Sequence, residues 1–260
     1  MSTTVESLIT TANRILSALP LEEYERLSAE LEPVSMPLGE ILCHPDEPIT
    51  HVYFPNRGTV SLVSNFEDGT SVEVGMVGNE GMFGVCVFLG SISTPLLAQV
   101  QLPGDGLRMR TDVLKREFNK CGQLQDLLLR YTQAFITQIA QTAACNRAHP
   151  MEGRLSKWLL MCEDRANSKE LELTHEFIAT MLGARRAGVT EAAGVLRSRG
   201  FIDYRRGHVI IRDRQGLESV TCECYPIVKK EFTRLIASNG THKAEQSLPT
   251  AGKAQALFYV

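Results

Sequence analysis

The sequence lacks the features that mark a membrane-spanning, secreted or catalytic protein. Its 260 residues contain no apolar run of about 18 residues, the length that a membrane helix needs. The N-terminus, MSTTVESLITTANRIL, has no basic segment followed by an apolar core, so we expect no secretory signal and a cytoplasmic location. No phosphate-binding glycine loop, zinc-binding motif or GxSxG sequence occurs. We therefore expect neither a membrane protein nor an enzyme.

Paired cysteines are also missing. The seven cysteines are scattered and odd in number, which suits reduced thiols, and no CxxC pair occurs. The closest pair is Cys222-Glu-Cys224. A metal or redox role for this pair is one alternative, but small buried apolar residues are the commoner use of free cysteine. We expect no metal and no cofactor.

Positive charge is scarce overall but concentrated in one place. The chain has a net charge of -3, yet residues 184–214 hold eight arginines against three acids, a local charge of +5. A basic window on an acidic protein indicates a binding site for a polyanion. The alternative is a solvated charged face with no partner.

The sequence pattern of the first half of the chain is typical of antiparallel β-structure. Residues 6–31 read as short helices, and short β-type runs follow from residue 34. Turn residues such as PNRG at 55–58 and EDG at 67–69 separate these runs at a spacing of about 8–12 residues, which is typical of a sandwich or barrel. We expect a jelly-roll-like antiparallel β-roll within residues 1–122. Its last two strands are LLAQVQL and GLRMR, ending near Arg110.

Residues 123–149 contain neither glycine nor proline and predict one long helix. One apolar stripe recurs every three or four residues, and a second apolar face carries Leu127, Ile136, Ala140, Ala143 and Ala144. Such a helix can cover its own domain and also pair with a second copy; the alternative is a helix that serves only its own core. We expect a homodimer with an interface formed by Leu124, Leu128, Tyr131, Phe135, Ile139 and Thr142.

Residues 150–225 follow the order helix, corner, helix, β-hairpin. Thr174 can cap the helix that ends near Gly183, and a second helix runs from about Arg185 to Arg199. FIDYRRGHVIIRD then reads as two short strands around an Arg206-Gly207 turn. This order predicts a winged helix-turn-helix, so the fold class is α+β. A last helix and a disordered tail are expected over residues 226–260.

The front of the second helix carries side chains that suit the major groove. Arginine can bind guanine O6 and N7 together, and glutamate can accept from cytosine N4. Basic side chains on the hairpin would lie over phosphates. An ordinary helical hairpin with a charged face is the alternative. The expected DNA-binding residues are Arg185, Arg186, Ala187, Thr190, Glu191, Arg197, Arg205, Arg206 and His208.

Four segments resemble the Crp/Fnr family of bacterial transcription regulators, and the resemblance spans about residues 10–225. They are LGEILCHPDEPITHVYFPNRGTVSLV at 38–63, EGMFG at 80–84, RLSKWLLM at 154–161 and LTHEFIATMLGARRAGVTEAAGVLRSRGFIDY at 173–204. The resemblance implies a sensory β-roll, a dimerisation helix and a C-terminal winged helix. It also implies double-stranded DNA and RNA polymerase as partners.

The chain departs from the family pattern at the sites that define its best-known branches. Nucleotide-binding members place a glutamate after the FG and an arginine in the following run, where this chain has Val85 and Leu96. No arginine or lysine occurs between Arg57 and Arg108, and a buried cyclic phosphate needs a paired cation. The first cysteine is Cys43, so the N-terminal cysteine cluster of the iron–sulfur branch is missing.

The recognition helix also departs from the family. Members often carry an Arg-Glu pair and a further arginine, and the matching positions here are Arg186, Ala187 and Glu191. We therefore expect a different operator. The leading hypothesis is a homodimeric DNA-binding regulator that does not respond to cAMP. The alternatives are a regulator gated by another small molecule in the β-roll, and a cyclic-nucleotide-type regulatory or interaction module.

Overall fold

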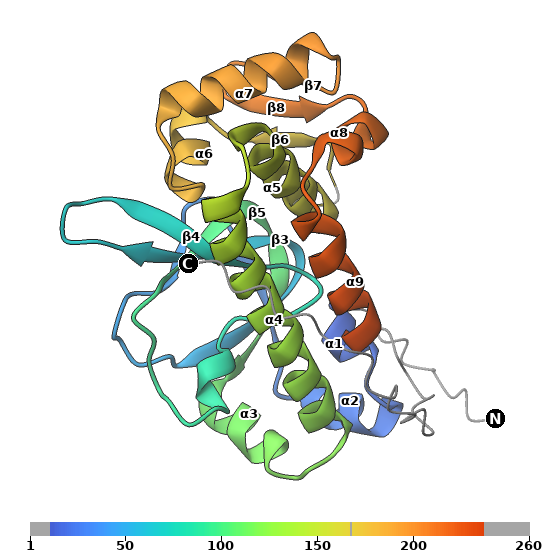
Figure 1. Ribbon diagram of the computed structural model, residues 1–260. Helices are drawn as coiled ribbons and strands as arrows, with labels where there is room; N and C mark the ends of the chain where they lie inside the picture. The colour runs from blue at the N-terminus through green and yellow to red at the C-terminus, as the bar shows by residue number, and fades with distance from the viewer. Residues whose placement is uncertain (1–10, 167, 237–260) are drawn as a thin grey trace, which may run out of the picture.

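Five antiparallel strands build the first half of the chain (Figure 1). This computed structural model describes residues 11–166 and 168–236. Neighbouring strands follow the order β1-β5-β3-β4, and β2 pairs with another part of β5. The expected antiparallel β-roll is thereby confirmed. Its strands are β1 (Glu32–Met36), β2 (Ile41–Cys43), β3 (His51–Asn65), β4 (Ser71–Val77) and β5 (Leu97–Arg110).

The two central strands are long and bent. Strand β3 has 15 residues and β5 has 14, and their pairing shifts register between Pro55 and Val60. Such irregularities bend a ladder and let one sheet curl into a roll. The sequence predicted two strands where β5 is one, because Pro103-Gly104 is taken up in a register shift and forms no turn. A Cβ on Gly104 would lie 2.0 Å from the carbonyl oxygen of Arg57, so only glycine fits there.

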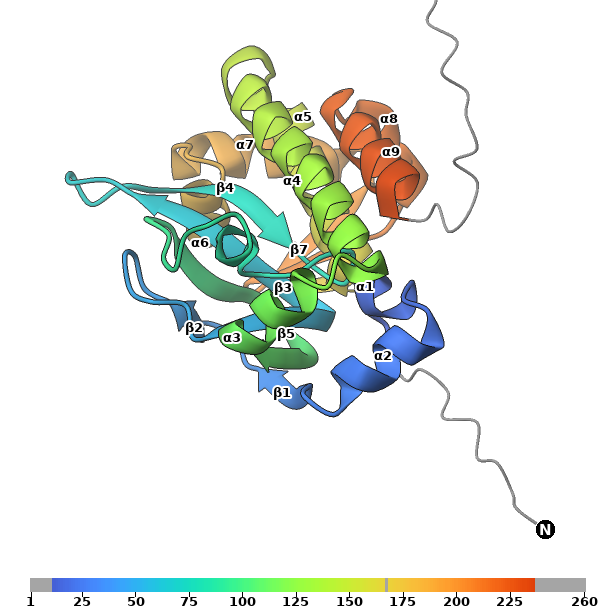
Figure 2. The same cartoon turned by 90° about the horizontal axis from the view of Figure 1, so that it is seen from below.

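Helices link the roll to the second half of the chain. Helices α1 (Arg14–Ser17) and α2 (Leu21–Ser28) precede the sheet and α3 (Thr111–Phe118) follows it. The long helix predicted over residues 123–149 is α4 (Gln123–Ala148). Helix α9 (Cys224–Ile236) lies beside α4 (Figure 2). The ring of its Phe232 lies 6.1 Å from that of Tyr131. The tail expected after this helix lies outside the described residues.

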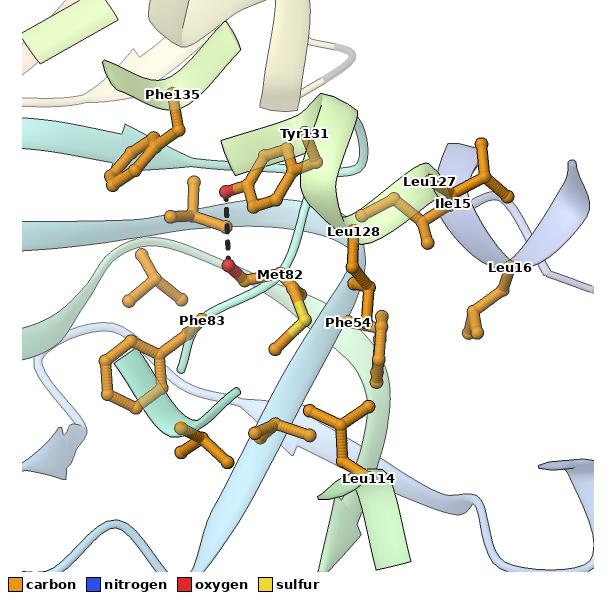
Figure 3. Packing of buried hydrophobic residues seen from close by; sticks show 14 of the residues in the cluster. Ile15, Leu16, Phe54, Met82, Phe83, Leu114, Leu127, Leu128, Tyr131 and Phe135 are labelled. Atoms are coloured by element: carbon orange, nitrogen blue, oxygen red, sulfur yellow. Dashed lines mark hydrogen bonds between the residues drawn. The ribbon is translucent and has the colours of Figure 1, made fainter. Parts of the chain in front are cut away.

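The inner face of α4 packs directly on the sheet. Tyr131 is fully buried and donates its hydroxyl to the carbonyl oxygen of Met82 at 3.1 Å (Figure 3). A Cβ on Gly81 would meet the Tyr131 ring at 2.1 Å, and one on Gly75 would meet Phe135 at 2.8 Å. Two glycines of the roll therefore make room for two aromatic rings of the helix. Burying each ring stabilises the fold by about 1.5–3 kcal/mol.

The second half is built around α5 (Met151–Ala166), which packs on the roll and on the helices that follow. A three-stranded sheet in the order β6-β8-β7 closes it. Two of these elements were not predicted from the sequence: β6, which has only three residues, and α8, whose interior contains Gly216. The elements are β6 (Glu170–Glu172), α6 (His175–Met181), α7 (Arg186–Ser198), β7 (Ile202–Arg205), β8 (His208–Ile211) and α8 (Arg214–Val220).

None of the helices in residues 11–166 and 168–236 is both long enough and apolar enough to cross a membrane.

Candidate DNA interface and sensory cavity

The helix-turn-helix forms where its local signals are placed. The Thr174 side chain accepts a hydrogen bond from the amide of Phe177 at 3.1 Å and caps α6, as the sequence predicted. The corner uses Gly183, which has a φ of +54°. Helix α7 then begins at Arg186, with Arg185 as its N-cap and Arg199 as its C-cap. The observed recognition helix agrees with the predicted span of 185–199.

The front of α7 is presented to solvent. Arg185, Arg186, Ala187, Thr190 and Glu191 are all exposed. The guanidinium of Arg186 lies 3.7 Å from Glu176, but both side chains are about 70% exposed, so this ion pair is weak. The opposite face of α7 is anchored in the core by residues such as Val189 and Leu196, which are fully buried. One face of α7 is therefore packed against the core, and the opposite face at its N-terminal end is accessible to solvent.

The wing is a tight hairpin. Arg206 and Gly207, the two turn residues, both have positive φ, of +48° and +88°, as a two-residue type I′ turn requires. Asp203 on β7 has arginine partners within 3.5 Å or less, namely Arg197, Arg205 and Arg212. Within the described part of the chain, neither Arg185 nor Arg206 has an ion-pair partner. The most available positive charges are therefore at the start of α7 and at the wing tip.

His175 connects α6, α7 and the wing. Its Nδ1 lies 3.1 Å from the hydroxyl of Thr190, and its ring lies 4.0 Å from that of Tyr204. Burial, with a smaller contribution from the nearby Arg186, lowers the pKa of His175 and so favours the neutral ring. The hydroxyl of Thr190, which was expected to face DNA, therefore already has a hydrogen-bond partner within the protein.

Some arginines of the basic window 184–214 form ion pairs within the protein and are not available to a polyanion. Arg199 pairs with Glu152 at 2.8 Å, and Arg214 donates to Glu163 and Asp164, each at 2.7 Å. Arg214 therefore holds the domain together. The expected DNA-binding residues fall into three places: the front of α7, its far end with Arg197, and the wing with Arg205, Arg206 and His208. Their contacts with DNA stay predictions.

The stripe that the sequence assigned to the dimer interface faces inward. Leu124, Leu128, Tyr131 and Phe135 are buried in the core of their own chain. Figure 3 shows the last three among the core side chains. Ile139 lines a cavity, and the Thr142 hydroxyl accepts a hydrogen bond from Lys157 at 3.3 Å. Side chains already buried in one chain have no surface to offer a second copy. Leu124, Leu128, Tyr131 and Phe135 therefore serve the core of their own chain. Ile139 and Thr142 are half-buried, and their part in a dimer interface stays a prediction.

A second face of α4 remains open. Ile136 is 54% exposed and Leu129 is 45% exposed, both high values for large apolar side chains. The exposed positions alternate in steps of four and three residues, which is the seam of a coiled coil. We call this the α4 seam, and its residues are Leu129, Gln133, Ile136, Ala140 and Ala143.

An apolar cavity of about 240 Å³ lies between the roll and α4. Val85 and Leu96 line it, together with Phe83, Ile136 and Ile139. Among residues 11–166 and 168–236, no arginine or lysine lines this cavity, and its polar lining residues include Thr94 and Thr132. Val85 and Leu96, the two departures from the family pattern, thus meet at one cavity, to which the described part of the chain supplies no cation for a phosphate.

A buried carboxyl joins the roll to the second half. Glu73 on β4 accepts hydrogen bonds from the hydroxyl of Ser61 at 2.5 Å and from the indole of Trp158 at 2.9 Å. Ser61 also lies 3.6 Å from the sulfur of Met181, the last residue of α6. Burial raises the pKa of Glu73 to about 7. Glu73 therefore connects β4 with α5 through Trp158, and through Ser61 on β3 it neighbours the end of α6.

A β-roll with a cavity, a long helix with an exposed seam and a winged helix-turn-helix together define a transcription regulator that binds DNA. A family model described as the Crp-like helix-turn-helix domain matches residues 153–220, and one described as the cyclic nucleotide-binding domain matches residues 33–120. The chain belongs to the Crp/Fnr family of transcription regulators.

The chain is similar to proteins that are named as global regulators. The global nitrogen regulator of Nostoc sp. is 26% identical over 176 residues, covering 64% of this chain and 79% of the relative. The CRP-like cAMP-activated global transcriptional regulator of Mycobacterium tuberculosis is 25% identical and covers 74% of this chain and 88% of the relative. The solved structure of FixK2 from Bradyrhizobium japonicum superposes with a TM-score of 0.63 at 18% identity, over 74% of this chain and 98% of that one, and shows a shared fold.

Proposed function

We propose that the chain reads duplex DNA through the front of α7 and the wing. The observation that carries this proposal is the arrangement of Arg185, Arg186 and Arg206, which are exposed on a rigidly anchored helix and hairpin. Arg186 is suited to a guanine edge in the major groove, and Arg206 to a phosphate. Glu191 replaces an arginine common in the family, so the operator differs from the best-known family sites.

The working form is a homodimer that pairs through the α4 seam. Two copies related by a two-fold axis would each supply the same face, so Leu129 and Ile136 of one copy meet those of the other. Both carry apolar surface that the single chain leaves in water. The two recognition helices would then read two half-sites of a palindromic operator. Action in the cytoplasm and contact with RNA polymerase stay predictions.

The effector of this regulator is not cAMP. A cyclic phosphate in the cavity would lose its hydration without gaining an ionic partner, because the lining that the described residues provide contains neither arginine nor lysine. The alternative effector is a small molecule with little charge, which suits the apolar wall. Ile136 borders both this cavity and the α4 seam, so an occupant that moves it would change how the two copies meet.

DNA recognition is tested with an operator selected from random duplexes by the wild-type protein. Arg186→Ala should weaken binding to it by about 1–3 kcal/mol and relax one base position. Arg206→Ala should weaken binding to all sequences alike and reduce the salt slope by about 1. Arg57→Ala, which removes an exposed arginine of the β-roll, is the matched control and should change neither. Wild-type affinity in a double Arg186→Ala, Arg206→Ala variant would refute this interface.

A further inference from the structure

Three thiols and an imidazole meet where α4 ends and α9 begins. Cys145 lies in the last turn of α4, and His149 is the residue that ends this helix. Cys222 and Cys224 come from the segment that leads into α9, 73 or more residues further along the chain. The ligand atoms of all four residues lie within 4.8 Å of one another.

The distances fit a single metal ion. The sulfur of Cys145 lies 3.5 Å from that of Cys222, and the sulfur of Cys224 lies 3.5 Å from Nδ1 of His149. A tetrahedral zinc ion with bonds of about 2.3 Å to sulfur separates its sulfur ligands by about 3.8 Å. An iron–sulfur cluster places several metal atoms between its cysteines and needs them farther apart. The four side chains are therefore close to the arrangement that one ion requires.

The backbone explains how the set assembles. Cys145 and His149 are four residues apart, so they project from one side of the end of α4. Cys222 and Cys224 present their sulfurs from the other side, and the three thiols are buried. Three cysteines and one histidine from two segments form a closed set with no position left for water, which is the composition of a structural zinc site.

The surroundings suit a bound cation and its thiolates. Nε2 of His149 lies 3.2 Å from a carboxylate oxygen of Glu223, so the imidazole can donate there while Nδ1 faces the thiols. Histidines that ligate metals are oriented by a carboxylate in this way. Three thiolates around one divalent ion leave a net charge of -1. Arg154 and Lys157 line the same small cavity as Cys145 and supply nearby positive charge.

We propose that Cys145, His149, Cys222 and Cys224 bind one Zn²⁺ ion, which fastens the start of α9 to the end of α4. Thiolate and imidazole ligands together select a borderline-soft divalent ion of this kind. The site lies at the joint where α4 gives way to α5, so the ion holds the C-terminal helix against the link between the roll and the DNA-binding half. This assignment stands whether or not the proposed DNA contacts are correct.

The untagged full-length chain, purified under reducing conditions without chelator, tests the site. We expect one zinc per chain by elemental analysis. After removal of zinc, titration with Co²⁺ should produce a thiolate-to-cobalt charge-transfer band and the visible bands of a tetrahedral cobalt ion. This spectrum counts thiolate ligands in the wild-type protein, so it does not depend on any variant being folded. Absence of both signals would overturn the proposal.

Variants locate the ion. Glu223→Gln should weaken Zn²⁺ binding about 10- to 100-fold in competition with a chromophoric chelator. Cys222→Ser removes a ligand and should weaken it further, and zinc should no longer raise the melting temperature. Cys121→Ser, which changes an exposed cysteine outside the cluster, is the control and should bind zinc as the wild type does. Equal loss in Cys121→Ser, or a Cys145–Cys222 disulfide in place of metal in anaerobically purified protein, would refute the site.

Discussion

Replacing Ile136 by glutamate should separate two subunits without unfolding either of them. Ile136 is 54% exposed in the single chain, so about half of its surface is still available for burial. Full burial of an isoleucine contributes about 1.5–3 kcal/mol, so the remaining half contributes about 1 kcal/mol or slightly more per chain, and about twice that per dimer. Ile136→Ala should therefore weaken the dimer by about 30- to 100-fold.

Glutamate adds a second effect. Two carboxylates would be brought together at the two-fold axis and taken out of water without a partner, at a cost of several kcal/mol. Sedimentation at micromolar concentration should show a monomer for Ile136→Glu, with loss of operator binding. Ile41→Glu, on β2 and also well exposed, should remain a dimer.

The neighbouring residue discriminates between the two faces of α4. Phe135 is 6% exposed, and its ring is stacked at 5.8 Å from that of Tyr131. Phe135→Glu should therefore lower the melting temperature sharply instead of giving a folded monomer. If Phe135→Glu were a stable monomer and Ile136→Glu a stable dimer, the assignment of the two faces would be reversed.

Three further results are expected. Calorimetry should find no saturable binding of cAMP below about 10 μM, and tight binding coupled to stronger operator binding would contradict the proposal for the cavity. The pKa of Glu73 is raised from its ordinary value near 4.5 to about 7, so the folded state binds the extra proton and stability falls as pH rises through this window. Urea titrations at several pH values should show this slope, at most about 3 kcal/mol in total, and Glu73→Gln should remove it; an unchanged slope would exclude Glu73 as its source. Arg165 lies 2.7 Å from buried Glu80, and Arg165→Met should lower the free energy of unfolding by about 3–5 kcal/mol because it leaves this carboxylate unpaired. An additional Glu80→Leu change should recover much of this loss of stability. No recovery would mean that packing, and not the ion pair, causes the loss.

Local signals were sufficient to predict the winged helix-turn-helix. The side chain of Thr174 caps a helix through an amide three residues away, Gly183 relieves a corner, and Gly207 allows a two-residue hairpin turn. Each of these caps and turns depends on residues only a few positions apart, so it can be predicted from a short stretch of the sequence. Strand β6 was not predicted, because three residues are too few to show an alternating pattern. Strand β5 was predicted as two strands divided at Pro103-Gly104, because the irregularity there depends on pairing with the facing strand β3.

The direction in which α4 faces was decided by its neighbours. Periodicity showed two apolar faces on this helix and could not tell which one the sheet would cover. Gly75 and Gly81 leave room for Phe135 and Tyr131, and this contact turns Ile136 outward. Leu124, Leu128, Tyr131 and Phe135 of the predicted dimer stripe therefore lie in the core, Ile139 and Thr142 are half-buried, and the adjacent face is the exposed α4 seam.

The sequence by itself determined the succession of β-roll, long helix and winged helix-turn-helix, the basic front of α7 and the lack of arginine and lysine between Arg57 and Arg108, because each depends on residue types and on short-range spacing. Only the tertiary structure decided which face of α4 is open and what surrounds Cys222 and Cys224. Cys145 and His149 lie more than 70 residues away along the chain, and they reach the same point because α9 packs back along α4. Such a set of ligands is a property of packed helices, and no local pattern contains it.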